Sequence, residues 1–401
     1  MPQELANVSR RRKARRRSEV GIDILPDEAL QRVLSFLPLA MPALRITSEQ
    51  GFLTPEDVTN LNRFLNMFMF LRDRGAPLDL CEIEIEEFDE CDNQPHVGIW
   101  IQQALLSQAG ILSVNVAHQN DGFVLDDVAL ISKHLTRLQL SSVGLKGKFL
   151  DFSCCLVLKS LCISSCDIYA EKISSQSLKQ LTIWNCLFYG IVRTRISTPS
   201  LAWLELSDCG DTPLLESMPL LEKAFVRFQS DSKDCCGKEE FGGSCTNKFC
   251  RNCGDNCDRS GDCILLKGLS RAESLELVAQ PGVFIFKRDL TWCPTFSNLK
   301  TLLLNEWCVA IDFDPLICFL QHTPVLEKLT LQLCKAPENW VEPRGFYIPT
   351  IEPLASRKLK VVEVKCEEFD ERVHQISRLL SIFNTYIEEI NIKWSAKRSV
   401  W

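Results

Sequence analysis

The chain has 401 residues, of which 46% are hydrophobic and 24% charged, and its formal net charge is −7. Such a chain can bury a large core, and its acidic balance disfavours nucleic-acid binding, which needs a clustered basic face. The longest apolar run, 64–71, is too short to cross a bilayer, so we expect no membrane partner either. No secretory signal peptide is expected, and the 20 cysteines are scattered through apolar segments, which predicts reduced, buried thiols in the nucleus or cytoplasm.

The first 22 residues are predicted to be a disordered basic arm. Seven Arg and Lys residues stand there against Glu4 and Glu19, with too few apolar residues to form a core. Such a run suits nuclear import or weak binding to an acidic surface, and it equally suits a solvated tail without a dedicated receptor.

An amphipathic helix is predicted in residues 23–40. A proline suits the first helical turn, and the apolar residues that follow recur at offsets of three and four. The stretch from Leu25-Pro26 to the Val-Leu-Ser-Phe-Leu-Pro run ending at Pro38 closely resembles the opening of an F-box, which docks onto the Skp adaptor of cullin-RING ubiquitin ligases. The resemblance implies adaptor contacts by Leu25, Pro26, Leu30, Val33, Leu34 and Leu37.

The F-box resemblance ends at Pro38. The family continues with two more helices, whereas here Leu39-Ala40 run directly into repeat-like sequence at Met41. A free helix of about 12 residues is marginal, and ordering it on a partner offsets much of the binding energy. Residues 23–40 are therefore interpreted as a partial F-box whose adaptor docking is weakened or lost.

One apolar template recurs through residues 41–354. It reads Leu-x2-Leu-x-Ile-x2-Cys from Leu158 to Cys166 and returns, with small changes, from Leu178 and from Leu201. This is the signature of leucine-rich repeats, in which each copy adds one strand to a curved parallel sheet. The Cys occupies the consensus position whose side chain hydrogen-bonds to the buried backbone of a turn.

The template predicts an α/β fold, a leucine-rich-repeat solenoid with helices and irregular segments on its convex side. Helices are predicted at 55–71 and 96–109. Thirteen strands are predicted, at 44–46, 81–83, 114–116, 138–140, 161–163, 181–183, 204–206, 224–226, 275–277, 302–304, 329–331, 362–364 and 390–392.

The segment 355–401 is predicted to end the chain with a strand, a helix at 369–382 and a further strand. This unit resembles the FBD region of the F-box/leucine-rich-repeat/FBD proteins of grasses, and the segment 71–78 resembles the part that follows their F-box. Together with the partial F-box, the resemblance covers roughly residues 23–394. We expect the last unit to cap the repeat array, because a terminal repeat must cover its apolar edge.

A Cys-rich insertion, residues 229–263, separates two repeats. Its cysteines Cys245, Cys250, Cys253 and Cys257 are spaced closely enough to share one tetrahedral zinc. The insertion is also rich in Gly, Ser, Asp and Lys, which fits a long loop without metal. We expect a loop and no cofactor, with a zinc site as the alternative.

The exposed face of the repeat sheet is the expected binding surface. The third and fifth positions of the template point away from the core, which places Arg137, Gln139, Trp203, Glu205 and Phe225 on that face. Trp203 and Phe225 come from consecutive repeats and would anchor a target protein, unless long loops cover them.

Catalytic constellations are missing from the sequence. The five histidines lie in separate segments, and no Gly-rich phosphate loop is present, so we expect no enzyme. The family resemblance implies a plant substrate-recognition subunit of a Skp/cullin/F-box E3 ubiquitin ligase, which recruits a target protein for ubiquitin-dependent degradation. Its partners would be a Skp-type adaptor and a cullin. The alternative is a leucine-rich-repeat binding scaffold that is uncoupled from the ligase because the F-box is incomplete.

Overall fold

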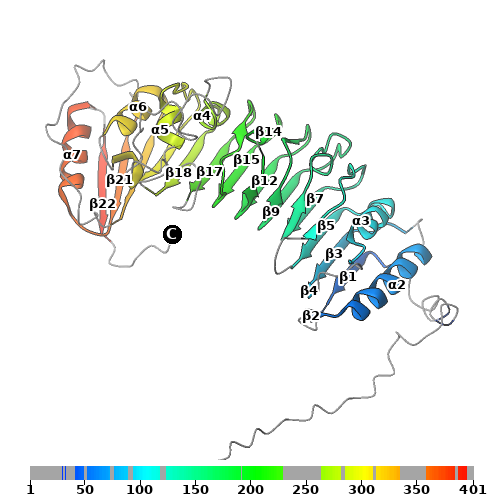
Figure 1. The fold of residues 1–401 in the computed structure, drawn as a ribbon. Helices are drawn as coiled ribbons and strands as arrows, with labels where there is room; N and C mark the ends of the chain where they lie inside the picture. Colours follow the sequence, from blue (N-terminus) through cyan, green and yellow to red (C-terminus); the bar gives the residue numbers. More distant parts are fainter. Residues whose placement is uncertain are drawn as a thin grey trace, which may run out of the picture.

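The protein is an α/β structure built on one elongated, 13-stranded parallel sheet (Figure 1). The computed structural model describes residues 29, 32, 41–48, 52–72, 76–88, 94–117, 123–190, 192–228, 263–280, 285–309, 313–334, 358–383 and 387–394. Neighbouring strands of the large sheet follow one another in sequence order. The predicted α/β class with a large parallel sheet is therefore confirmed.

Every predicted strand lies within one strand of the large sheet. These strands are β1 (Ala43–Thr47), β3 (Leu80–Ile85), β5 (Ile111–Val116), β7 (Arg137–Ser141), β9 (Ser160–Ser164), β12 (Gln180–Trp184), β15 (Trp203–Ser207), β17 (Lys223–Phe228), β18 (Ser274–Ala279), β19 (Thr301–Asn305), β20 (Lys328–Leu333), β21 (Val361–Cys366) and β22 (Glu389–Trp394). One register was wrong: Leu112, not Val114, aligns with Cys81 and Leu138. A slip of two residues keeps the same side chains buried, so the alternating pattern does not separate the two registers.

The core forms because the repeated apolar positions stack in register. Leu161, Leu181 and Leu204 are paired across β9, β12 and β15, and each is at most 1% exposed. Burying such a side chain contributes about 1.5 to 3 kcal/mol. Alternate residues of the same strands point to the opposite, exposed face of the sheet.

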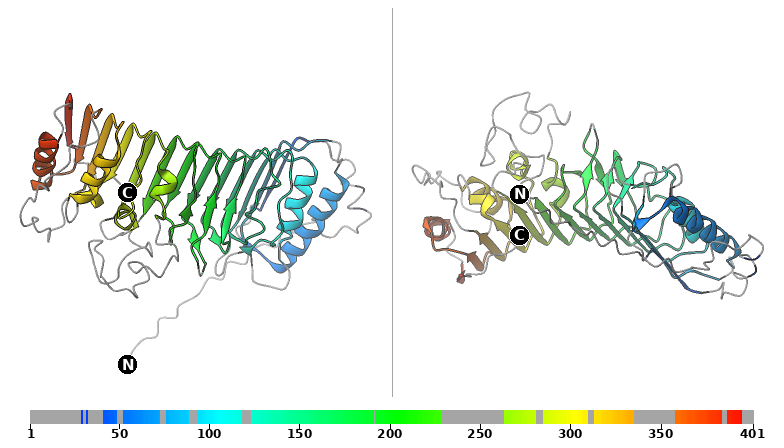
Figure 2. Two further views of the ribbon diagram at one scale, coloured as in Figure 1. Left: turned by 90° about the horizontal axis from the view of Figure 1, so that it is seen from above. Right: turned by 60° about the horizontal axis from the view of Figure 1, so that its bottom comes forward.

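Short strands form the second layer in the middle of the molecule, on the side where helices and irregular segments were predicted (Figure 2). One small sheet has the order β13-β10-β8-β6 and another the order β11-β14-β16, while β2 pairs with β4 nearer the N-terminus. Their bounds are β2 (Phe52–Leu53), β4 (Glu87–Phe88), β6 (Phe123–Val124), β8 (Val143–Leu145), β10 (Asp167–Ile168), β11 (Lys172–Ser174), β13 (Leu187–Phe188), β14 (Arg195–Ser197) and β16 (Leu214–Leu215).

The cysteines at the ends of the repeats hydrogen-bond to the backbone, as predicted. The thiols of Cys166, Cys186 and Cys209 donate to main-chain carbonyls of the preceding repeat, at 3.6, 3.6 and 3.9 Å. All three side chains are at most 3% exposed. A buried carbonyl without a partner would be costly, so these thiols hold consecutive repeats together.

Left-handed residues turn the chain at the corners after β7, β9, β12 and β15. Ser142, Ser165, Asn185 and Asp208 have φ between 51° and 57°. Each of their N–H groups donates to a carbonyl at the end of the next main strand, at 2.9 to 3.1 Å; the acceptor is the last residue of the strand for the first three and Arg227, the second-last residue of β17, for Asp208. The left-handed conformation costs a residue other than Gly roughly 1 to 2 kcal/mol, so each corner is strained locally while it is hydrogen-bonded across repeats.

Replacing Ser142 tests the strain at these corners. We expect Ser142→Gly to raise the free energy of unfolding, because Gly adopts this φ without a Cβ clash, and Ser142→Val to lower it by about 1 to 2 kcal/mol. Urea denaturation followed by circular dichroism measures both. Equal stabilities of the two variants would show that the corner carries no strain.

Two neighbouring helices cover the N-terminal end of the sheet. Helix α2 (Pro55–Leu71) has the predicted bounds, and a capping box between Thr54 and Asp57 fixes its start. Helix α3 (Val97–Leu106) is shorter than the predicted 96–109, since the chain turns at Gln108, whose φ is 62°.

Two polar residues of α2 hold α3 in place. The Asn62 side chain is buried, accepts from the His96 N–H at 2.8 Å and donates to the Gln94 carbonyl at 2.9 Å. One turn later, Asn66 accepts from the indole N–H of Trp100 at 3.0 Å. The apolar stripe predicted α2 correctly, but these contacts between the helices are not part of that stripe.

Helices return in the C-terminal half. They are α4 (Leu266–Leu269), α5 (Ile285–Leu290), α6 (Asp314–His322) and α7 (Glu371–Phe383), with a 3-10 turn, η3, at Glu306–Val309. The Asp289 carboxylate on α5 is fully buried and accepts from the N–H groups of Ile264 and Leu266, at 2.9 and 3.0 Å. It thereby fixes the start of α4, because a buried carboxylate needs such donors.

The end of the chain contains the predicted strand, helix and strand, as β21, α7 and β22. Helix α7 buries Val373 and Ile376. On the last described strand, Ile390 and Ile392 remain 40% exposed and Trp394 61% exposed. A complete cap over this edge therefore stays a prediction.

Candidate functional site

The predicted adaptor-binding and zinc-binding residues lie outside the described residues. These are Leu25, Pro26, Leu30, Val33, Leu34 and Leu37, together with Cys245, Cys250, Cys253 and Cys257. Within 23–40 the structure describes only Ala29 and Arg32, and both are helical. The predicted basic arm, 1–22, lies outside as well.

The predicted target-binding residues all lie on the exposed face of the large sheet. Arg137 and Gln139 on β7 are exposed, while Trp203, Glu205 and Phe225 are half-buried. Trp203 is paired with a lysine of β17, and Phe225 lies opposite Glu205, so the two aromatic residues are diagonal neighbours rather than a directly opposed pair.

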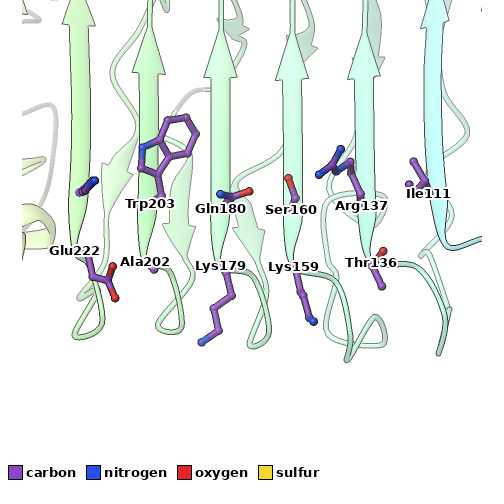
Figure 3. A pocket seen from close by; sticks show the side chains of 11 residues that line it. Ile111, Thr136, Arg137, Lys159, Ser160, Lys179, Gln180, Ala202, Trp203 and Glu222 are labelled. Atoms are coloured by element: carbon purple, nitrogen blue, oxygen red, sulfur yellow. The ribbon is translucent and has the colours of Figure 1, made fainter.

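A groove of about 670 Å³ crosses this face from β5 to β17. Arg137 and Trp203 line it, whereas Gln139, Glu205 and Phe225 do not. The full lining is Ile111, Thr136, Arg137, Lys159, Ser160, Lys179, Gln180, Ala202, Trp203, Glu222 and Lys223 (Figure 3). The groove is open because short side chains, such as those of Ser160 and Ala202, lie between long ones.

The floor of the groove is chemically mixed, but its charge is mainly positive. Arg137, Lys159, Lys179 and Lys223 are exposed cations, and Glu222 is the one carboxylate in the lining. The groove is therefore cationic although the whole chain is acidic. Sequence analysis found Arg137 and Trp203 but missed Lys159 and Lys179, because these two lysines precede their strands.

A backbone ladder fixes the spacing of those preceding residues. The N–H of Lys179 donates to the carbonyl of Lys159 at 2.9 Å, and the N–H of Ala202 donates to that of Lys179 at 2.9 Å. The same bond recurs toward the C-terminus through Glu222, Glu273, Lys300, Glu327, Lys360 and Glu388. Side chains at this position therefore follow one another at the strand spacing, about 4.8 Å.

Charges along the C-terminal part of the ladder alternate in sign. Lys300 pairs with Glu273 at 2.7 Å, and Lys360 pairs with Glu388 at 2.9 Å. These pairs raise the pKa of both lysines, first through the hydrogen bond and then through the carboxylate charge. Both lysines in this part of the ladder are therefore paired with a carboxylate.

The groove breaks that alternation. Lys159 and Lys179 are consecutive in the ladder and have the same sign (Figure 3). No salt bridge with another described residue is formed by any of the four cations Arg137, Lys159, Lys179 and Lys223. Like charges on adjacent strands are destabilising, so this arrangement is unfavourable unless an anion binds there.

Reversing one charge of the ladder tests this reasoning. We expect Lys179→Glu to raise the free energy of unfolding by about 0.2 to 1 kcal/mol at low salt, because a carboxylate would then lie beside Lys159. The matched change Lys300→Glu should lower stability, since it places a third carboxylate between Glu273 and Glu327. Urea denaturation at two salt concentrations measures both, and a loss of stability in Lys179→Glu would contradict the expectation.

A second ion-pair group lies on the same sheet face, near its C-terminal end. Glu363 is 8% exposed and contacts Lys328 at 3.2 Å and Lys393 at 2.5 Å. The hydrogen bond from Lys393, and further that from Lys328, holds the pKa of Glu363 below its usual value. Its contribution to stability is present above the unfolded-state pKa and is lost as the pH falls through the lower folded-state pKa. This group joins β20, β21 and β22.

Most described cysteines that lie in strands or close repeats are buried and unreactive. Burial raises the pKa of both Cys81 and Cys209 to about 12. Cys318 is different: its pKa is lowered to about 7, first by a hydrogen bond from Cys293 and then by the nearby His322. A thiol with a lowered pKa forms thiolate more readily at neutral pH.

Sequence analysis missed the proximity of Cys318 and His322 because it considered each histidine separately. Cys318 and His322 are four residues apart on α6, a spacing that places two side chains on one face of a helix. That spacing was the available signal. Cys293 comes from a different segment, so its proximity could not be inferred from the helix alone.

Comparisons with known proteins add no relative. No family model, no curated protein and no solved structure matches the chain. Among the described helices, none has the length and apolarity that crossing a membrane requires. The arguments for function therefore rest on the sheet face, its groove and its charges.

Proposed function

We propose that the protein is a leucine-rich-repeat recognition protein, the substrate-recognition subunit of a Skp/cullin/F-box ubiquitin ligase acting in the nucleus or cytoplasm of a plant cell. The observation that carries the recognition role is the groove from β5 to β17, which combines unpaired cations with Trp203 on one continuous sheet. The repeat class is supported by thirteen parallel strands in sequence order with the same buried positions. In this role the protein is non-catalytic.

The target segment that this groove fits is extended and acidic. The lining runs across six strands, and six strands at about 4.8 Å span about 24 Å, the length of roughly seven extended residues. Carboxylates of the segment would lie beside Lys159 and Lys179 and relieve their repulsion. An apolar or aromatic residue would pack on Trp203, since aromatic side chains dominate the energetics of interfaces.

A synthetic peptide tests the groove. The probe is a fluorescent peptide of about eight residues, rich in Glu and Leu, and its counterpart has Lys in place of Glu. We expect the acidic peptide alone to bind, with a Kd that rises with salt because exposed charges are screened. Trp203→Ala and the double variant Lys159→Ala/Lys179→Ala should each weaken binding at least tenfold by fluorescence anisotropy.

Matched variants on the same sheet are the controls. Trp184 is 46% exposed on β12 and does not line the groove, so Trp184→Ala should leave the affinity unchanged. The double variant Lys300→Ala/Lys360→Ala removes the same charge from the paired part of the ladder and should also leave it unchanged. Equal losses in the two lysine pairs would show that binding depends on net charge, not on the groove.

The link to the ligase rests on the F-box resemblance of residues 23–40. In this proposal Leu30 and Leu34 of the helix predicted from the sequence bind a Skp-type adaptor, which connects the protein to a cullin. The second candidate is a binding scaffold without ligase coupling, and the truncated motif favours it. The two functions use the same groove and differ only in adaptor binding.

Co-purification with the adaptor separates the two candidates. If the ligase function is correct, the tagged full-length chain recovers a Skp-type adaptor, and Leu30→Asp/Leu34→Asp abolishes recovery, because charges replace the apolar contact. A version with a restored complete F-box is the positive control. Recovery by that version and not by the full-length chain would reject ligase coupling and leave the scaffold.

A further inference from the structure

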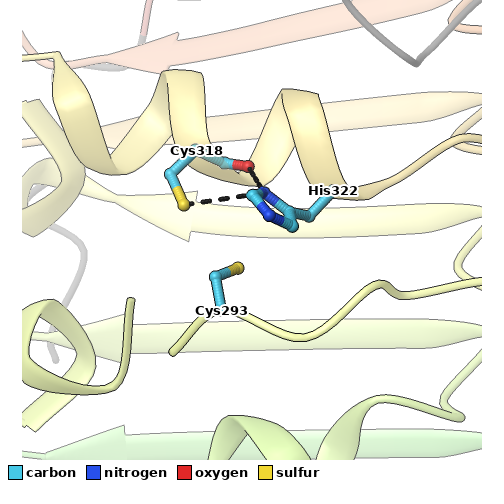
Figure 4. Close-up of side chains that lie close together, drawn as sticks. All are labelled: Cys293, Cys318 and His322. Atoms are coloured by element: carbon cyan, nitrogen blue, oxygen red, sulfur yellow. Dashed lines mark hydrogen bonds between the residues drawn. The ribbon is translucent and has the colours of Figure 1, made fainter. Parts of the chain in front are cut away.

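A group of three metal-ligating side chains lies on the other side of the sheet from the groove, between two neighbouring repeats. Cys293 follows α5, and Cys318 and His322 belong to α6. Their ligand atoms all lie within 4.8 Å of one another, and the side chains converge on one space (Figure 4). We propose that these three residues bind a zinc ion that joins the segment after α5 to α6.

The separations are close to those of a zinc site. Tetrahedral zinc, at about 2.3 Å from sulfur and about 2.0 to 2.1 Å from nitrogen, places its ligand atoms about 3.3 to 3.8 Å apart. The ligand atoms of Cys293, Cys318 and His322 all lie within 4.8 Å of one another. Small side-chain rotations bring these three atoms to the spacing of a tetrahedral site.

The imidazole is held as a metal-binding histidine is. Nδ1 of His322 lies 2.8 Å from the Cys318 carbonyl oxygen. A carbonyl can only accept, so Nδ1 carries the proton and Nε2 keeps the lone pair that binds a metal. Zinc-binding histidines commonly donate their second ring N–H to such an oxygen, which fixes the ring.

Backbone bonds hold the third ligand in place. The N–H groups of Trp292 and Cys293 donate to the carbonyls of Asp289 and Leu290, at 3.0 and 3.2 Å, and continue α5 as a turn. All three ligand residues are half-buried, so an ion can enter and the side chains stay partly shielded. The described residues offer no fourth His, Cys, Asp or Glu in the group, which leaves one position for water.

The charges and protons of the site balance. Zn²⁺ replaces one proton on each of the two thiols, forms two Zn–S bonds and one Zn–N bond, and releases two protons. Two thiolates, a neutral imidazole and Zn²⁺ have no net charge, which suits a half-buried position. Because α5 precedes β19 and α6 follows it, the ion would tie consecutive repeats together.

Metal analysis of the full chain tests the site. The starting variant carries Cys245→Ser, Cys250→Ser, Cys253→Ser and Cys257→Ser, so that the four predicted zinc ligands of the insertion are removed. We expect about one zinc per chain after incubation with zinc chloride and gel filtration, and a thiolate-to-metal absorption band when cobalt replaces zinc. Adding Cys318→Ser and His322→Gln should remove both signals, while circular dichroism of the metal-free variants should be unchanged.

The matched control replaces Cys154 and His134, an exposed cysteine and an exposed histidine outside the group. Cys154→Ser/His134→Gln should keep the full zinc content. The proposal fails if the starting variant holds no zinc, or if zinc persists after Cys318→Ser/His322→Gln. A Cys293–Cys318 disulfide in protein purified under reducing conditions would also overturn it, because the thiols would then be a redox pair.

Discussion

The hydrogen-bonded register between consecutive strands is the constraint on which the rest of the structure depends. Parallel strands about 4.8 Å apart bring the same position of every repeat into one row. Rows of Leu161, Leu181 and Leu204 make the core, and the row of repeat-closing cysteines binds buried carbonyls. Neighbouring side chains of a row belong to residues 20 or more positions apart in sequence. The chemistry of each surface row is thus decided by one residue per repeat.

This constraint makes charge placement a choice between stability and binding. Where the ladder alternates, as with Glu273 and Lys300, opposite charges on neighbouring strands pair and strengthen the sheet. Where Lys179 directly follows Lys159, the row keeps an unbalanced positive charge beside Trp203. Groups that bind a partner are commonly retained at some cost to the free protein, and an anionic partner would remove this cost.

The two sides of the sheet have different tasks. The exposed side is continuous and carries the groove, whereas the buried side is closed by short strands in the middle and by helices toward both ends (Figure 1). On that side polar contacts fix the helices, as Asn62 does between α2 and α3 and Asp289 does between α5 and α4. The Cys318 and His322 group lies among such contacts, where a metal would act as a further connection between repeats.

Periodicity in the sequence determined the main elements. The alternating and helical patterns predicted the thirteen strands and the bounds of α2, because burial of one face imposes those periods directly on the sequence. The same alternation could not choose between Leu112 and Val114, since both registers bury the same side chains. The exposed positions of Arg137 and Trp203 followed from the template as well.

Only the tertiary structure decided which side chains share a site. The groove forms only if Lys159 and Lys179 lie at the same level along their neighbouring strands. Backbone hydrogen bonds between repeats fix that alignment. Cys293 meets Cys318 and His322 because segments of consecutive repeats pack together, at a sequence separation that depends on the loop lengths between them. Local sequence patterns indicate which face of the sheet a residue occupies. Contacts between repeats depend in addition on the length and path of each intervening loop.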